Sequence, residues 1–385
     1  MNAKRYTPNN AYYDTTKDNC AQHTACLIVR PACAGHTADC TPFCQAVDVV
    51  FNGEYKGCYQ LCDKVEVKKN RIDIDEMLPT DTIGEALTGS YMWEIDGNAR
   101  KEPNPYYSPH NMPITLHSPK DDEIVPAQRA YFESYFDSLE NIVYRASETD
   151  TTWRQYIDYS TFVRYFLINN VCANTDIYWQ CFMYKKRGDM KAYTGPVWDF
   201  DLAFDNDKRL YPISEYQKYL LSSAPNTYPF TRHILYADQW TREQRLEYWH
   251  RARNAGINAD ELCLFVDSVA QVLDASQDLN FTRWKILDKR VHQNPVALGS
   301  YSAEVERLKE FIVNHIDWMD RKLNYEWHPI EPPPTSVEYT EAEQSDYRVF
   351  DVHGRMIHSG AHLPNLPAGL YIIQHNGKAT KVLHP

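Results

Sequence analysis

The alternation of apolar and polar residues predicts several strands in the first third of the chain. A two-residue period favours strands because successive strand side chains point to opposite faces. Asn52-Gly53, a strong hairpin-turn signal, lies between the first two such runs. The predicted strands are 46–51, 57–62, 91–95 and 114–116. Residues 1–45 show neither period, and we expect them to be rich in loops.

Past Pro126 the apolar residues recur every three or four positions, which predicts amphipathic helices. The expected helices are 130–143, 156–170, 241–275 and 302–324. Two short strands are expected between the second and the third helix, at 181–185 and 191–198. They are joined at the turn Arg187-Gly188-Asp189.

A run of prolines marks the end of the helical part. Pro332, Pro333 and Pro334 follow the last helix and predict a stiff linker. Beyond it, short strands with glycine turns predict a small all-β module. The expected parts are a cysteine-rich segment 1–45, a main domain 46–327, a linker 328–345 and a β-rich module 346–385.

Charge and composition exclude several classes of protein. The chain has 385 residues and a formal charge of −12, so it has no basic excess with which to bind a nucleic acid. Aromatic residues make up 13%, which is too many for a disordered chain. No apolar run approaches the roughly 20 residues of a membrane span, and none is expected.

Seven of the ten cysteines lie in the first 62 residues, at irregular spacings and without a C-x-x-C pair. A zinc site is therefore a weak interpretation. A disulfide-stapled segment and a set of free or buried thiols both remain open. The start, Met1 to Arg5, is followed by polar residues and is not a secretory signal peptide. Taken alone, this implies a cytoplasmic protein.

The most informative stretch is acidic and runs from Gly195 to Asp207. Asp199 and Asp201 follow a predicted strand two residues apart, and in an extended chain they share a face. Two such carboxylates are suitable ligands for Mg²⁺, completed by water and phosphate oxygens. The spacing does not fit a calcium-binding EF-hand loop. The alternative interpretation is a solvated acidic turn.

Two further features fit phosphoryl transfer. Asp176 lies some twenty residues before the acidic pair, as does the Asp that accepts the substrate proton in phosphoryl-transfer enzymes. Its alternative interpretation is a common helix-exit sequence. Lys64 follows a predicted strand, from which it can reach nucleotide phosphates, and Arg71 adds positive charge nearby. Lys68 and Lys69 are more typical of a solvated face.

Several ordered blocks of the chain resemble the spore-coat-protein-H (CotH) kinase family, over about residues 46–325. The blocks are Val49–Leu61 with its Asn-Gly turn, Asp63-Lys64, Asn70–Asp73, Pro113-Ile114-Thr115, Asn174-Thr175-Asp176, Gly195–Phe204 and Ile316–Met319. Trp-Asp-Phe-Asp-Leu-Ala-Phe, residues 198–204, is the most specific of them.

The resemblance implies an α+β, atypical protein-kinase-like fold with a small β-rich N-lobe and a helical C-lobe. It implies transfer of the γ-phosphoryl group of ATP, with Mg²⁺, to Ser or Thr of a protein substrate. Carried over by position, Asp176 resembles the catalytic aspartate, and Asp199 with Asp201 the metal-binding block. Lys64 is the best match for the phosphate-contacting lysine, with Asp63 and Arg71 as further cofactor-binding candidates.

The chain departs from the family at two places. Asp63 stands where members commonly have Glu, so its carboxylate reaches about one methylene less far. Residues 1–45 do not look like the family's upstream N-lobe, and a misassigned start or a shifted reading frame would explain this and the missing signal peptide.

The tail resembles a C-terminal type IX secretion sorting module, over about residues 346–385. The resemblance rests on Asp351-x-x-Gly-Arg and on Pro-Ala-Gly-Leu-Tyr, residues 367–371. It implies export by the type IX machinery to the cell surface or the medium, against the cytoplasmic indication of the N-terminus. The alternative is an ordinary β accessory module.

Three functions follow from this sequence. The first is an exported, Mg-ATP-dependent CotH-like kinase. The second is a catalytically inactive kinase-fold protein that binds partners through its many Tyr and Trp residues. The third is a haloacid-dehalogenase-type phosphatase with Asp199 as its nucleophile, which the mid-chain position and Trp198 disfavour.

Overall fold

A computed structural model gives the fold and divides the chain into two compact units, Met1–Trp327 and His328–Pro385. It describes residues 42, 44–69, 71–177, 179–209, 211, 224, 226–254, 257–291, 294–326, 347–351, 356–360, 362–367, 369–375 and 378–384. The predictions for the linker 328–345, and for the cysteine-rich segment except residues 42, 44 and 45, lie outside these ranges.

The first hairpin forms as the sequence predicts. It comprises β1 (Cys44–Phe51) and β2 (Glu54–Cys62). The turn residues Asn52 and Gly53 have φ of 51° and 78°, the positive values that a tight two-residue turn requires. A Cβ at Gly57 would stand 3.0 Å from Asn280 Oδ1 and 3.0 Å from Trp284 Nε1. The absence of a side chain at Gly57 therefore lets β2 pack closely against the helix that contains Asn280.

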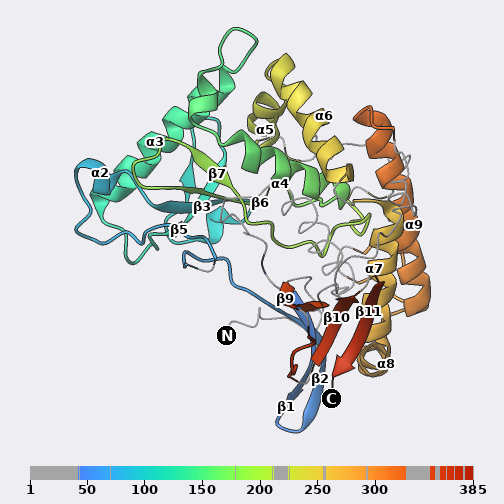
Figure 1. The fold of residues 1–385 in the computed structure, drawn as a ribbon. Coiled ribbons are helices and arrows are strands. Elements are labelled where there is room, and N and C mark those ends of the chain that lie inside the picture. The colour runs from blue at the N-terminus through green and yellow to red at the C-terminus, as the bar shows by residue number, and fades with distance from the viewer. Residues whose placement is uncertain are drawn as a thin grey trace. The chain divides into compact units, whose positions relative to one another are not determined.

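A second sheet of this unit has five strands (Figure 1). Its order is β4 (Tyr106–Tyr107), β5 (Pro113–Ser118), β3 (Tyr91–Asp96), β6 (Gln180–Lys185) and β7 (Ala192–Thr194). All neighbouring strands are antiparallel. The predicted pairing of 91–95 with 114–116 is confirmed, with Glu94 opposite Thr115.

Both faces of β3 are buried. Trp93 faces α3 (Pro126–Tyr144), where its ring centroid lies 5.5 Å from that of Phe132. Because side chains alternate along a strand, Glu94 and Asp96 lie on the opposite face. Charged residues are rarely buried without partners. Glu94 and Asp96, two carboxylates on a buried sheet face, therefore mark that face as a candidate functional site.

The most buried helix is α4 (Tyr159–Val171), which begins where the Asp158 side chain accepts a hydrogen bond from the Thr161 N–H. Eleven of its thirteen residues are buried. The other helices, apart from α3, are α2 (Gly84–Leu87), α5 (Tyr228–Leu235), α6 (Gln239–Asn254), α7 (Ala259–Val272), α8 (Asp274–Arg283) and α9 (Tyr301–Lys322), with short 3₁₀ turns at Ala99–Lys101 and Thr152–Gln155.

One helix prediction is wrong, since residues 241–275 do not form a continuous helix. The Asn258 side chain accepts the Glu261 N–H at 2.6 Å and so starts α7 as a separate helix. A capping side chain satisfies a free N–H at a helix start, which makes the break favourable. Within the described residues, no helix is long and apolar enough to cross a membrane.

A buried ion pair ties α6 to α9. Arg253 donates from Nε and Nη2 to the two carboxylate oxygens of Asp320, each at 3.0 Å. Trp249 Nε1 donates to the same carboxylate at 2.9 Å. A buried carboxylate with this many donors is well compensated for its loss of water.

The C-terminal unit is a four-stranded antiparallel sheet of order β11-β10-β8-β9. Its strands are β8 (Tyr347–Asp351), β9 (Met356–Gly360), β10 (Gly369–His375) and β11 (Lys378–His384). Val349, Leu366, Tyr371 and Ile373 form its small core. The sequence predicts this β-rich composition correctly, because its strands are short and separated by turn residues.

Replacing Asp320 with Ala is expected to destabilise the protein by about 3–5 kcal/mol, because Arg253 would remain buried without its partner. Urea unfolding measures the loss. Asp317→Ala is the matched control on the same helix, since its ion pair with Arg321 leaves both side chains 63% exposed and should change stability by less than about 1 kcal/mol. Equal losses of stability in the two variants would show that the buried Arg253–Asp320 pair contributes no more than an exposed ion pair.

Stability is expected to fall between pH 6.5 and pH 4 because of His315. Its Nε2 donates to the Asn170 carbonyl at 2.5 Å, and burial lowers its pKa from 6.5 to about 4. Below pH 6.5 His315 becomes protonated in the unfolded chain but stays neutral in the folded chain until about pH 4. The free energy of unfolding is therefore expected to fall by up to about 3 kcal/mol over this range.

Urea unfolding at a series of pH values checks this expectation. His315→Gln should flatten the dependence, whereas the same change at exposed His362 should leave it as it is. An unchanged slope in His315→Gln would show that other groups cause the loss.

Candidate functional site

Two loops meet beyond the end of α4. Residues 172–176 follow α4, and the acidic segment 195–207 follows β7. Asn174 joins them, because its Nδ2 donates to the Asp199 carbonyl at 3.3 Å and its Oδ1 accepts the Asp176 N–H at 3.1 Å. This side chain therefore fixes the two predicted aspartates relative to one another.

The acidic segment has an unusual backbone. Asp199, Phe204 and Asp205 have φ of 59°, 56° and 60°, values that are uncommon outside glycine. The Phe204 N–H donates to the Cys172 carbonyl at 2.6 Å, and Arg307 donates to the Asp205 carbonyl at 2.7 Å. Such conformations persist where neighbouring contacts over-determine them and are typical of functional turns.

This turn corrects the geometry expected for Asp199 and Asp201. The sequence predicts extended chain over 191–198, but β7 ends at Thr194. Asp199 and Asp201 therefore do not share the face of a strand. Asp201 begins a turn, in which its carbonyl accepts Asn206 Nδ2 at 2.9 Å. The cause lies in contacts distant in sequence, which the local pattern does not contain.

Asp176 lies in this junction with its side chain 16% exposed. Burial raises the pKa of its carboxyl, Arg209 opposes that rise, and the charges of Asp199 and Asp207 add to it. Two further carboxylates, those of Asp199 and Asp207, therefore lie within electrostatic reach of Asp176. A carboxylate with a raised pKa is a typical proton acceptor in enzymes.

The sequence analysis missed a further pair on the sheet. His117 Nε2 lies 2.7 Å from Glu94 Oε2, and Thr115 donates to Asp96 at 2.9 Å. Burial raises the pKa of Glu94, the bond with His117 opposes this, and Asp96 and Asp199 add to it. The influence of Asp199 on Glu94 shows that this sheet face borders the acidic segment.

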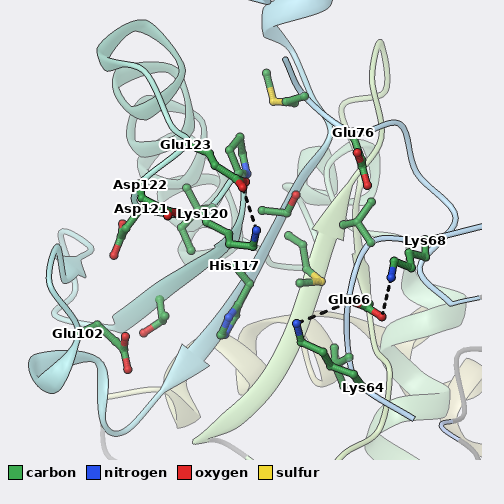
Figure 2. A pocket seen from close by; sticks show the side chains of 18 of the residues that line it. Lys64, Glu66, Lys68, Glu76, Glu102, His117, Lys120, Asp121, Asp122 and Glu123 are labelled. Carbon is green, nitrogen blue, oxygen red and sulfur yellow. Dashed lines mark hydrogen bonds and ion pairs between the residues drawn. The ribbon is translucent and has the colours of Figure 1, made fainter. Parts of the chain in front are cut away.

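A cavity of about 690 Å³ lies beside this pair. It is lined by residues 64–68, 76, 77, 92, 102, 103 and 115–123. Figure 2 shows Lys64, Glu66 and Lys68 from the chain after β2 on one side, and His117 and Lys120 from the end of β5 on the other. Its volume is in the range of small-molecule sites. Asp176 and Asp199 are not part of its lining.

Of the three residues predicted to bind the cofactor, Lys64 alone is in the cavity lining. Lys64 lines the cavity, where its Nζ lies 3.6 Å from Glu66. Asp63 and Arg71 are not among the lining residues, and Arg71 Nη2 donates to Asp63 at 3.1 Å while Nη1 contacts Glu66. Asp63 and Arg71 therefore brace the segment that carries Lys64.

Asp199 is the candidate metal ligand of this site. Among the residues that the structure describes, no three His, Cys, Asp or Glu side chains are grouped closely enough to hold a metal ion. Mg²⁺ usually needs only one or two carboxylates, with water and phosphate oxygens completing its shell. Asp199, close enough to Asp176 and Glu94 to raise the pKa of both, supplies such a carboxylate.

A signal for the missed residues was present in β3. Glu94 and Asp96 interrupt an otherwise apolar strand at positions that share one face. Their partners His117 and Thr115 come from β5, and only the register of the two strands brings them together.

Comparison with known proteins identifies the family. No match is found among curated proteins. A family model described as CotH kinase protein matches residues 36–319, which is well over half of the chain. The matched region contains the hairpin, the five-stranded sheet, both loops and the cavity lining. The chain belongs to the CotH kinase protein family.

Proposed function

We propose that this chain is an exported kinase that transfers the γ-phosphoryl group of Mg-bound ATP to Ser or Thr of a secreted or surface protein. The family indicates a protein-kinase-like function. One observation carries the finer proposal: Asp176 and Asp199 lie on two loops joined by Asn174, and Asp199 also raises the pKa of Glu94, the partner of the cavity-lining His117.

Each residue has a role in this chemistry. Asp176 accepts the proton of the substrate hydroxyl as its oxygen forms a bond to the γ-phosphorus, and the bond to the ADP oxygen breaks. Asp199, with Asp201, would hold Mg²⁺, which neutralises phosphate charge when bound. Lys64 contacts the phosphates from the cavity wall. Asn174 keeps base and metal ligand in register, as positioning requires.

The charge of the cavity supports metal dependence. Its lining has more acidic than basic side chains: Glu66, Glu76, Glu102, Asp121, Asp122 and Glu123 against Lys64, Lys68 and Lys120. Lys64 and Lys68 both lie near Glu66, at 3.6 and 3.4 Å, which offsets their charge. A bare triphosphate would be repelled here, whereas its complex with a divalent cation is less negative.

A second candidate is a catalytically inactive kinase-fold binding protein. The contact of Arg209 with Asp176 is the observation that favours it, because it occupies the proposed base. Nucleotide binding separates the two candidates. The phosphatase interpretation loses its basis, since Asp199 does not directly follow a strand and the family match indicates a kinase.

Two variants are expected to distinguish a loss of Mg-ATP binding from a loss of phosphoryl transfer. Asp199→Ala should weaken Mg-ATP binding at least about tenfold, because a metal-holding charge is lost. Asp176→Asn should bind Mg-ATP normally yet release ADP about 10²–10⁴-fold more slowly. Calorimetry measures the first effect and ADP release the second.

Asp267→Asn is the matched control, because this aspartate is 51% exposed and pairs with Lys309 away from the site. It should bind and turn over Mg-ATP like the unaltered chain. Absence of Mg-ATP binding by the unaltered chain would contradict the kinase proposal and support the binding-protein candidate.

Export through the C-terminal module is part of the proposal. In a Bacteroidota-type cell, the full chain and a chain ending at residue 345 would each be given the same secretory leader. We expect the full chain at the cell surface or in the medium and the shorter one in the periplasm. Equal distribution in cell fractions would contradict a sorting role.

A further inference from the structure

Arg209 connects two aspartates that belong to different parts of the site. It donates from Nε to both carboxylate oxygens of Asp207, at 2.9 and 2.7 Å, and its backbone N–H adds a bond of 2.9 Å. Its Nη2 lies 2.6 Å from Asp207 Oδ2 and donates to Asp176 Oδ1 at 2.9 Å. One guanidinium therefore spans the buried carboxylate and the proposed base.

The two ends of this bridge differ in burial. The Asp207 side chain is 1% exposed, whereas the Arg209 side chain is 47% exposed. The buried carboxylate receives several bonds and is the fixed end. A planar guanidinium with its N–H groups in a rigid fork transmits that fixed position to the second carboxylate.

The charges around Asp176 require such a partner. The negative charges of Asp199 and Asp207, both in the acidic segment, raise the pKa of Asp176. Asp199 also raises the pKa of Glu94, a further carboxylate on β3. Arg209 is the cation that acts on Asp176 against these groups. Arg209 therefore offsets the repulsion that these carboxylates exert on Asp176.

We propose that Arg209, anchored on Asp207, is a positioning residue that holds the Asp176 carboxylate charged and in one orientation for proton transfer. This inference rests on the proposed kinase function, because it assigns the orientation of that reaction's base. Arg209 acts through Asp176 and not through the phosphates.

The test uses the full chain and measures ADP release together with Mg-ATP affinity. Arg209→Gln is expected to lower kcat about 10- to 100-fold and to leave the Kd for Mg-ATP unchanged. Arg209→Lys keeps the charge but not the fork, so it should recover only part of kcat. Arg242→Gln is the matched control, with a side chain 48% exposed in a single ion pair to Glu148.

A double variant decides whether Arg209 acts through Asp176. In the Asp176→Asn background, Arg209→Gln should cause no further loss of kcat, because residues that act as a unit are non-additive. A further loss would show that Arg209 acts on the nucleotide itself and would overturn the inference. Urea unfolding of each variant separates this effect from a loss of folded protein.

The remaining outcomes are distinct. If the unaltered chain turns over Mg-ATP and Arg209→Gln does so equally well or faster, Arg209 does not position the base, and the inference alone fails. If the unaltered chain binds or turns over no Mg-ATP, the proposed function fails and the inference fails with it.

Discussion

The site depends on the mutual repulsion of carboxylates that the fold brings together. Asp199 and Asp207 act electrostatically on Asp176 across two loops, and burial makes the charges of Asp176 and Asp207 more costly. Such a cluster is stable only with fixed donors and a counter-charge. Asn174 and Arg209 supply these from the chain itself, and a bound divalent cation would add positive charge where the acidic excess remains.

The loop that carries Asp176 is attached to buried, tightly bonded helices. The loop with Asp176 begins at the end of α4, and His315 of α9 bonds to the carbonyl of Asn170 in the last turn of α4. The Arg253–Asp320 pair fixes α9 against α6. The proposed base is therefore held by packed helices, and a site on rigid elements holds its geometry best.

The sheet contributes the other wall of the site. The alternation of β3 sends Trp93 into the core with α3 and Glu94 towards the acidic segment. Pairing with β5 then places His117 beside Glu94 at the edge of the cavity that Lys64 lines. One strand thereby serves both stability and the site, which explains its carboxylates among apolar residues.

The sequence by itself determined the elements whose signals are local: the Asn52-Gly53 hairpin, α3, α4, α9, the strands of the C-terminal unit and the acidic segment with Asp199. It also determined the family, through ordered motifs. The tertiary structure alone decided the turn at Asp199, the break before α7, the Glu94–His117 pair and the Arg209 bridge. Each of these depends on groups far apart in the chain, and a hydrogen bond or ion pair between such groups leaves no period or local spacing in the sequence.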